Sequence, residues 1–375
     1  MKKAILALED GHFFYGYAFS GFKVGETGGE VIFNTSMTGY QEILTDPSYK
    51  GQIVVMTPSE VGNYGVNEED IESDNIHVNG FVIKDLSFIS SNWRATKRLQ
   101  EYLEENNIIG IYGIDTRALV RIIRQYGVMK GYIGIGDISP VEAVKKARTI
   151  PDISELQLVP KVSKGKIYKW NEGSWEWPNG YKKITETKYK VAVLDFGIKK
   201  NILRLLADRQ LDLTVFPYNT PAEEIIKFQP DGIFLSNGPG DPAILHYQIE
   251  QIKKLLKTDI PMFGICLGHQ LLSWALGGKT YKLEFGHHGG NHPVKNLKTG
   301  KVEITAQNHN YATDPDSLPT NVEITHINLN DNTIEGIRLT DRPVFSIQYH
   351  PESSPGPHDS LYLFDEFVKL IESCK

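Results

Sequence analysis

Pro261-Met262-Phe263-Gly264-Ile265-Cys266-Leu267-Gly268-His269-Gln270 decides the fold of the C-terminal half of this chain. An apolar strand pattern runs directly into Gly-x-Cys-x-Gly and then into a helix pattern over 268–276. The flanking glycines permit a strained strand-to-helix turn that lifts the side chain of Cys266 above the sheet edge. The helix N-terminus then stabilises a thiolate, and the N–H of Leu267 points to where an oxyanion would form. A buried structural cysteine in a tight turn would give the same local pattern.

Strand and helix patterns alternate on both sides of this turn. Apolar runs over 190–194, 213–217 and 232–235 predict strands, and a helix pattern follows each of them. Continuous apolar strands joined by helices indicate a parallel sheet covered on both faces. Short strands are predicted from Lys279 onward, before an amphipathic helix that runs from Ser360 to about Glu372.

The N-terminal part mixes strand and helix patterns, and a stretch rich in Lys, Gly and Trp separates it from the α/β part. We predict an N-terminal mixed β/α domain over 1–160, a bridge over 161–188 and a doubly wound α/β domain over 189–375. Three of the five tryptophans lie in the bridge. Large rings are unusual in flexible linkers, so we expect the bridge to pack against both domains.

Composition excludes several classes of function. The 375 residues are 40% hydrophobic and 23% charged, with a formal net charge of −6, which is typical of a globular protein and not of a disordered chain. No basic block suits nucleic acid or an anionic membrane. No apolar run approaches the ~18 residues of a membrane span, and the N-terminal apolar stretch is too short for a signal peptide. Two cysteines do not make a disulfide framework, so a cytoplasmic protein is expected.

A second motif with candidate catalytic side chains, His350-Pro351-Glu352, follows the strand pattern over 344–349. Residues i and i+2 of a strand face the same way, so the two side chains can project together, and Pro351 stiffens the pair. A cysteine nucleophile needs a base, and the base needs an orienting group. We therefore predict Cys266 as nucleophile, His350 as its base and Glu352 as the group that orients His350. Taken alone, His350 and Glu352 would also fit a solvated loop.

The stretch Ser236-Asn237-Gly238-Pro239-Gly240-Asp241-Pro242 also joins a strand pattern to a helix pattern. Gly-Pro-Gly at the carboxyl end of a strand lets backbone N–H groups approach a ligand closely. Gly238 is therefore the predicted second oxyanion donor beside Leu267. A plain tight turn has the same sequence features.

In this order, the three segments resemble the class I glutamine amidotransferase domain, in which a Cys–His–Glu triad hydrolyses glutamine. Further stretches resemble the small, glutaminase subunits of carbamoyl phosphate synthetases: Phe285-Gly286-His287-His288-Gly289-Gly290-Asn291-His292-Pro293-Val294, and residues 33–49, 113–119 and 195–199. The resemblance covers residues 8 to about 367. It implies a flavodoxin-like amidotransferase domain that attacks the amide of L-glutamine, forms a γ-glutamyl thioester, and releases ammonia and glutamate.

The resemblance also implies which residues bind glutamine. One of them, Ser48, lies in the N-terminal domain, which implies a substrate pocket near the domain interface. The family usually has Gly-Phe where this chain has Asn310-Tyr311. Asn adopts a left-handed backbone more readily than most residues, and Tyr keeps the ring, so the loop is expected to survive. The implied contacts are Ser48, Gly238, Gly240, Leu267, Gln270, Asn308, Asn310 and Tyr311.

No metal or cofactor is expected in this subunit. His287, His288 and His292 have a spacing that zinc could use, but no cysteine or carboxylate falls among them, and the resemblance implies no metal. A loop that shapes the site is the preferred interpretation. No Gly-x-x-x-x-Gly-Lys-Ser/Thr loop occurs. ATP, Mg²⁺ and bicarbonate would therefore be used by a separate large subunit, the implied partner, and the N-terminal domain is the expected surface on which that subunit docks.

Three alternatives stay open. The amidotransferase could serve a different synthetase, the chain could be a non-catalytic relative, or it could be a cysteine peptidase on the same fold. The N-terminal domain argues against the first alternative, and the intact Cys266, His350 and Glu352 argue against the second. The sequence does not distinguish arginine from pyrimidine biosynthesis as the destination of carbamoyl phosphate.

Overall fold

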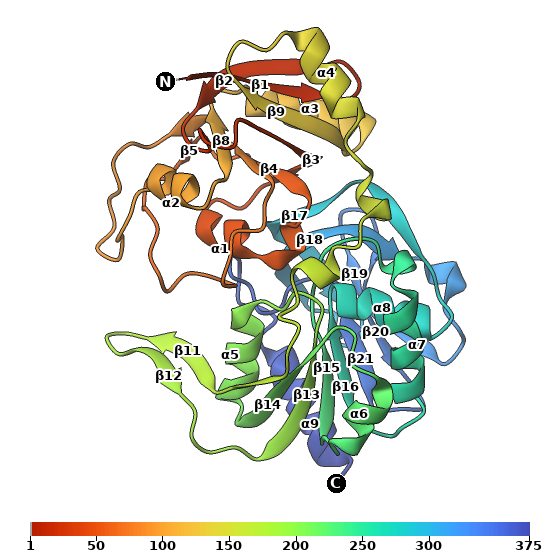
Figure 1. The fold of residues 1–375 in the computed structure, drawn as a ribbon. Helices are drawn as coiled ribbons and strands as arrows, with labels where there is room; N and C mark the ends of the chain where they lie inside the picture. Colours follow the sequence, from red (N-terminus) through yellow and green to blue (C-terminus); the bar gives the residue numbers. More distant parts are fainter. Residues whose placement is uncertain (1) are drawn as a thin grey trace. The chain divides into compact units, whose positions relative to one another are not determined.

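The computed structural model describes residues 2–375, which divide into two compact units. The first unit comprises the chain up to Leu156 together with Glu284–Gly289, and the second comprises Gln157–Leu283 and Gly290–Lys375. Figure 1 shows a β-rich first unit with a few helices and an α/β second unit. The predicted fold class, a mixed β/α part followed by a doubly wound α/β part, is confirmed.

The first unit is built on a closed barrel of strands in the order β1-β2-β8-β6-β4-β3-β9. The pairs β3–β4, β4–β6 and β6–β8 are parallel. The other four pairs of the barrel are antiparallel. The barrel strands are β1 (Lys2–Leu8), β2 (Phe13–Ala18), β3 (Glu26–Asn34), β4 (Gln52–Met56), β6 (Gly80–Val82), β8 (Ile109–Tyr112) and β9 (Met129–Ile135). A small sheet pairs β5 (Glu60–Val61) with β7 (Asp85–Leu86). The helices are α1 (Tyr40–Thr45), α2 (Leu99–Glu105), α3 (Thr116–Tyr126) and α4 (Pro140–Arg148).

Both faces of the parallel strands in this unit are buried. Val31 and Ile53 pack in a cluster that includes residues of α3, whereas their neighbours Ile32 and Val54 pack in a cluster that includes residues of α1 and α2. Because successive strand residues point to opposite faces, continuous apolar runs are what these doubly covered strands require.

The second unit holds a ten-stranded sheet in the order β10-β14-β13-β15-β16-β21-β20-β19-β17-β18. Its central strands β14, β13, β15, β16 and β21 run parallel. The prediction that only short strands follow Lys279 was wrong, because β17 has 17 residues and β18 has 12. Gly and Pro residues interrupt the apolar pattern of β17 without ending the strand. The bounds are β10 (Tyr168–Trp170), β13 (Tyr189–Asp195), β14 (Leu211–Pro217), β15 (Gly232–Leu235), β16 (Met262–Ile265), β17 (Thr280–Asn296), β18 (Val302–Thr313), β19 (Val322–Asn328), β20 (Ile334–Leu339) and β21 (Val344–Ile347).

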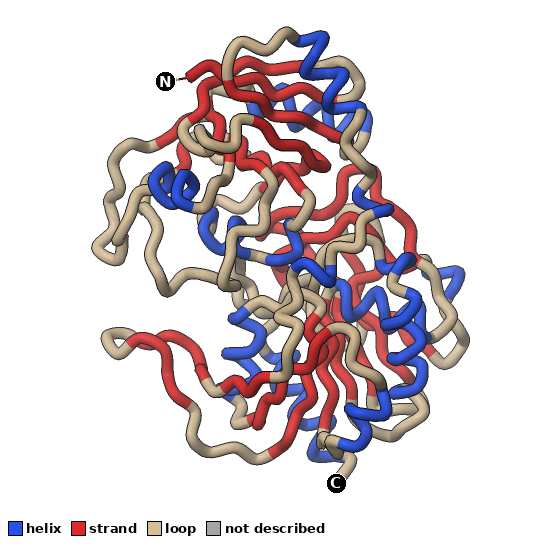
Figure 2. The backbone as a smooth tube through the Cα atoms, viewed as in Figure 1, coloured by secondary structure: helices blue, strands red, loops and turns tan. Residues whose placement is uncertain are grey.

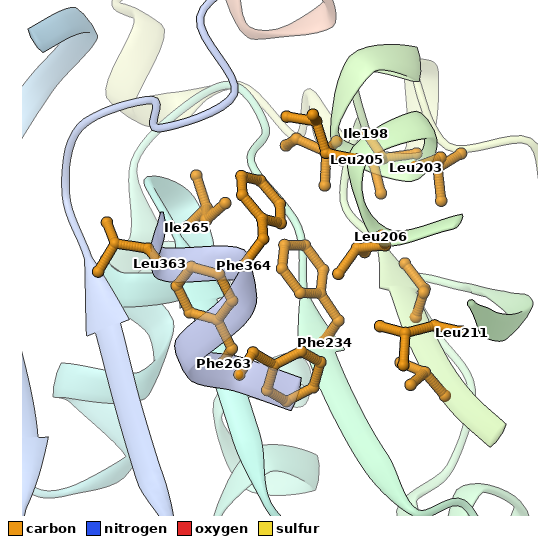
Figure 3. Packing of buried hydrophobic residues seen from close by; sticks show 14 of the residues in the cluster. Ile198, Leu203, Leu205, Leu206, Leu211, Phe234, Phe263, Ile265, Leu363 and Phe364 are labelled. Carbon is orange, nitrogen blue, oxygen red and sulfur yellow. The ribbon is translucent and has the colours of Figure 1, made fainter. Parts of the chain in front are cut away.

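Helices cover both faces of this sheet. One apolar cluster holds residues of α5 (Lys200–Asp208) and α9 (Tyr362–Ser373), and the other holds residues of α6 (Ala222–Lys227), α7 (His246–Leu255) and α8 (Leu267–Ala275). In the first cluster Phe263 packs edge-on against Phe234 and Phe364, with ring centroids 5.3 and 5.9 Å apart (Figure 3). Burial of such rings fixes the sheet and its carboxyl ends, where the polar residues lie.

The predicted bridge is mostly ordered. Its first strand, β10, is the antiparallel neighbour of β14. The next two, β11 (Glu172–Glu176) and β12 (Gly180–Lys183), form a hairpin that extends away from the sheet of the second unit (Figure 2). Arg204 of α5 contacts both strands of this hairpin. Its Nε lies 2.9 Å from Oε1 of Glu172, and its guanidinium lies 3.7 Å from the ring centroid of Tyr181. Within residues 2–375, every helix is too short or too polar to cross a membrane.

Candidate active site

Cys266 lies between β16 and α8, in a strained turn. Its φ of +53° and ψ of −107° belong to a region that L-residues rarely adopt. The backbone N–H of Cys266 donates to the carbonyl oxygen of Ile347 at 2.9 Å, which ties the turn to β21. A Cβ added to Gly268 would lie 2.3 Å from the carbonyl oxygen of Leu235, so only glycine lets α8 approach β15 this closely.

His350 and Glu352 follow β21, which is the parallel neighbour of β16. The carboxyl ends of adjacent parallel strands meet at one edge of the sheet, so Cys266 and His350 come together there. Nδ1 of His350 donates to Oε1 of Glu352 at 2.6 Å, and the backbone N–H of His350 donates to the carbonyl oxygen of Ala306 at 2.8 Å. Pro351 and Glu352 form a turn, so the pairing arises from turn geometry and not from the strand alternation that we expected.

The charges of these buried side chains depend on one another. Burial alone would raise the pKa of Glu352, but Lys199 and His350 outweigh burial and lower that pKa to about 2. Burial alone would lower the pKa of His350, but Glu352 and Cys266 raise it to about 10. His350 is therefore an imidazolium at neutral pH. It lies between the Glu352 carboxylate and the sulfur of Cys266, which itself is 3.6 Å from the carbonyl oxygen of Asn308.

Two residues at the start of α5 also hold the site, and the sequence pattern did not indicate either of them. Nζ of Lys199 lies 2.9 Å from Oε1 of Glu352 and donates to the carbonyl oxygen of Ser353 at 2.5 Å. Nδ2 of Asn201 donates to the backbone carbonyl oxygen of Glu352 at 2.6 Å. Both hold the segment that carries the His–Glu pair. The stretch 195–199 was singled out for its resemblance alone, and nothing in a single sequence shows that a lysine is buried.

The turn that delivers Lys199 is shaped by Asp195, which ends β13. Oδ1 of Asp195 accepts hydrogen bonds from the backbone N–H groups of Gly197 and Ile198, both at 3.0 Å. The backbone N–H of Lys199 in turn donates to Oδ1 of Asn237 at 3.2 Å. These bonds satisfy N–H groups around the first turn of α5, where the helix itself supplies no acceptors.

The predicted oxyanion donors, Leu267 and Gly238, follow two neighbouring strands of the second unit, β16 and β15. Leu267 is the first residue of α8, so its N–H is one of the four at a helix start that have no intrahelical acceptor. Gly238 follows β15, and a Cβ there would lie 2.3 Å from the carbonyl oxygen of Phe196. Gly240 has a φ of +93°, which glycine adopts without strain.

The other predicted glutamine contacts of this unit are gathered on α8 and β18. Nε2 of Gln270 donates to the carbonyl oxygen of Tyr311 at 2.9 Å and to Oε1 of Gln348 at 3.1 Å. Asn308, Asn310 and Tyr311 are buried members of β18. Asn310 does not use the left-handed backbone that asparagine tolerates, because it lies within β18 and its φ is not positive.

Ser48 belongs to the first unit. It is buried in the 3₁₀ turn Pro47–Tyr49, and its N–H donates to Oδ1 of Asp46 at 2.8 Å. Its contact with glutamine stays a prediction, as does the absence of a metal. Of the histidines that suggested zinc, His287 and His288 fall in the first unit and His292 in the second.

A doubly wound sheet with a cysteine in a strained strand-to-helix turn, and with a buried His–Glu pair just after the neighbouring strand, defines the class I glutamine amidotransferases. The family model "Glutamine amidotransferase class-I" matches residues 192–370. A second model, "Carbamoyl-phosphate synthase small chain, CPSase domain", matches residues 6–133. The carbamoyl phosphate synthase small chain of Aquifex aeolicus is 60% identical over 371 residues, 99% of each chain. That of Escherichia coli K12 is 52% identical over 379 residues, 99% of this chain and 98% of the other. The chain belongs to the carbamoyl phosphate synthase small chain family.

Proposed function

We propose that this chain hydrolyses L-glutamine to glutamate and ammonia and passes the ammonia to a separate large subunit, which makes carbamoyl phosphate from bicarbonate and ATP for arginine or pyrimidine biosynthesis. The observation that carries the proposal is the buried group of Cys266, His350 and Glu352 at adjacent strand ends. The match of residues 6–133 to the small-chain domain favours this synthetase over others that use a similar amidotransferase.

The first half of the proposed reaction forms a thioester. The sulfur of Cys266, with its proton on His350, attacks the side-chain amide carbon of glutamine. The carbonyl oxygen becomes an oxyanion, which the backbone N–H groups of Gly238 and Leu267 stabilise. His350 then gives its proton to the amide nitrogen, the C–N bond breaks, and ammonia leaves. The raised pKa of His350 keeps this proton available for the leaving group.

The second half hydrolyses the γ-glutamyl thioester. Neutral His350 takes a proton from water, the hydroxyl attacks the thioester carbon, and the C–S bond breaks. Glutamate leaves, and the thiolate–imidazolium pair is restored. Glu352 and Lys199 take part through His350: the carboxylate orients the ring and favours its protonated form, and the lysine keeps the carboxylate ionised.

Glutamine is proposed to contact Ser48, Gln270, Asn308, Asn310 and Tyr311 in addition to the oxyanion loops. The chain is proposed to need no metal or cofactor for this half-reaction. The absence of a Gly-x-x-x-x-Gly-Lys-Ser/Thr loop from the sequence supports an ATP site on the partner. Cytoplasmic localisation, where glutamine, bicarbonate and ATP are supplied, is part of the same proposal.

The test is glutamate release from glutamine by this chain, with and without a carbamoyl phosphate synthase large subunit, ATP and bicarbonate. We expect slow release by the chain alone, strong stimulation by the partner, and loss of both in Cys266→Ala. Cys374→Ala is the matched control, because Cys374 is exposed near the C-terminus. Hydrolysis that persists in Cys266→Ala would overturn the nucleophile. Hydrolysis that ignores the large subunit would overturn the choice of synthetase.

A further inference from the structure

Gln348, a side chain that the proposed mechanism does not use, contacts Gln270 inside the second unit. Gln348 directly follows β21, and its backbone N–H donates to the carbonyl oxygen of Glu335 on β20 at 2.9 Å. Its side chain is 0% exposed, and its Oε1 accepts a hydrogen bond from Nε2 of Gln270 at 3.1 Å. Two side-chain amides therefore meet in the interior, one four residues after Cys266 and the other two residues before His350.

The backbone of Tyr311 sets the direction of this hydrogen bond. Nε2 of Gln270 also donates to the carbonyl oxygen of Tyr311 at 2.9 Å, and a backbone carbonyl oxygen can only accept. The NH₂ group of Gln270 has two protons, and these two acceptors use both of them. The partners of an amide decide which of its ends is the nitrogen. The Gln270 amide is therefore held with its nitrogen toward Tyr311 and Gln348.

Gln348 keeps this orientation at the expense of its own nitrogen. Nε2 of Gln348 is enclosed by protein and has no hydrogen-bond partner within residues 2–375. A buried donor without a partner destabilises a protein, so its presence needs a reason. If the Gln348 amide turned around, its NH₂ group would face the NH₂ group of Gln270, and the hydrogen bond would be lost. The unsatisfied nitrogen follows from presenting an oxygen to Gln270.

The oxygen of the Gln270 amide is left available as an acceptor. Oε1 of Gln270 accepts no hydrogen bond within residues 2–375, and it is not enclosed by protein as Nε2 of Gln348 is. Gln270 lies on the first turn of α8, four residues or about 6 Å along the helix from Cys266. Its backbone N–H donates to the carbonyl oxygen of Cys266 at 3.1 Å. An acceptor in this place suits a donor on the part of the substrate away from the reacting bond.

L-Glutamine has one such donor, its α-ammonium group. The α-carboxylate can only accept hydrogen bonds and would be repelled by the amide oxygen of Gln270. A hydrogen bond from a charged donor is also stronger than one from a neutral donor. If the Gln270 amide were reversed, its NH₂ group would face the ammonium group, and two donors cannot bond to each other. The orientation of this one amide therefore decides whether the site favours or rejects an α-ammonium group.

We infer that Gln348 is a positioning residue for substrate specificity: it locks the Gln270 amide so that the oxygen receives the α-ammonium group of glutamine. This rests on the proposed function and on the proposed contact between Gln270 and glutamine. Gln348 acts through Gln270 and takes no part in the chemistry at Cys266. Its loss should weaken recognition of the ammonium group and leave thioester formation in place.

The test compares L-glutamine with glutaramate, which is glutamine without its α-amino group. Ammonia release from each is measured for the chain together with its large subunit. Gln348→Met keeps the size of the side chain and removes the strong acceptor. We expect kcat/KM for glutamine to fall about 10-fold or more, mainly through KM, because a hydrogen bond to a charged group is weakened. For glutaramate it should change by less than about 3-fold. Gln348→Glu, which keeps an acceptor oxygen, should retain the preference for glutamine.

Gln251→Met is the matched control. Gln251 is a buried glutamine of α7, and its Oε1 accepts a hydrogen bond from the backbone N–H of Ala222 at 3.0 Å. This variant loses a comparable buried hydrogen bond elsewhere in the unit and should keep the preference for glutamine over glutaramate. Thermal unfolding checks that each variant folds. If Gln348→Met does not fold, Gln348→Asn replaces it, because the shorter amide cannot reach Gln270.

An equal fall in kcat/KM for both substrates in Gln348→Met would overturn the inference, because it would show a general structural role. An unchanged preference would overturn it too, and would leave the glutaminase chemistry standing. If the unmodified chain hydrolyses neither compound, the proposed function fails, and calorimetric binding of both compounds to Cys266→Ala decides the inference. Gln348→Met in that background should weaken the binding of glutamine but not of glutaramate, and any other result would overturn the role of Gln348.

Discussion

Nζ of Lys199 lies 2.9 Å from Oε1 of Glu352, and the two side chains are only 3% and 0% exposed. The same carboxylate oxygen also accepts the hydrogen bond from His350 at 2.6 Å. One buried anion thus serves two cations. A buried ion pair of this kind does not by itself make a protein more stable, but removing one partner leaves the other charge uncompensated. The Lys199–Glu352 ion pair therefore links the stability of the second unit to the protonation state of His350, the candidate base.

Lys199→Gln should destabilise the chain by about 3 kcal/mol, because it leaves the Glu352 charge buried beside one cation only. Lys199 and His350 together lower the pKa of Glu352 to about 2, so the stability that the ionised form contributes is present above the ordinary value of 4.5 and is lost as pH falls through about 2. Without Lys199 the pKa rises and that loss begins at higher pH. Urea unfolding at several pH values measures both effects.

The control is Lys253→Gln, which removes an exposed pair with Glu250 and should change stability by less than about 1 kcal/mol. If the two substitutions change the unfolding free energy equally, the buried ion pair matters no more to stability than the exposed one.

Glu352→Gln should reduce kcat for glutamine hydrolysis by about 10³-fold, within the range for loss of acid–base function. It should also move the alkaline limb of the pH–rate profile. Glu352 and Cys266 together raise the pKa of His350 to about 10, so the imidazolium is lost as pH rises through that value. Without the carboxylate the imidazolium is lost at lower pH, and activity should decline from a lower pH upward. A slower variant with an unmoved alkaline limb would contradict this role.

Gly268→Ala should disrupt the turn at Cys266, because the new methyl group would meet the carbonyl oxygen of Leu235 at 2.3 Å and push α8 away from β15. We expect a loss of about 1–3 kcal/mol in unfolding free energy and a large fall in kcat. Gly277→Ala is the control: nothing lies within 4 Å of its added Cβ, so only its φ of +95° costs stability, by about 1–2 kcal/mol. Its kcat should stay near that of the unmodified chain.

Cys266→Gly should be more stable than Cys266→Ala by about 1 kcal/mol, although neither hydrolyses glutamine. The φ of +53° and ψ of −107° strain any residue with a Cβ, and glycine relieves that strain while it costs more chain entropy. Urea unfolding of the two inactive variants isolates the strain from the chemistry. Equal stability would mean that the turn relaxes around alanine.

The sequence by itself determined the features that depend on near neighbours. Gly-x-Cys-x-Gly between a strand and a helix predicts the turn at Cys266, because periodicity and glycine act within ten residues. His350 and Glu352 are two positions apart, so their pairing could be predicted from the sequence, even though a turn and not a strand produces it.

Only the tertiary structure decided which distant segments meet. The parallel pairing of β16 with β21 brings Cys266 to His350, and the closure of β9 on β1 makes the barrel of the first unit. Lys199 reaches the carbonyl oxygen of Ser353 across 154 positions. Such pairings depend on how whole strands bury their apolar faces, which no local pattern records. Burial then decides the charges: the same lysine on a surface would hold a carboxylate weakly, whereas in the interior it keeps Glu352 ionised.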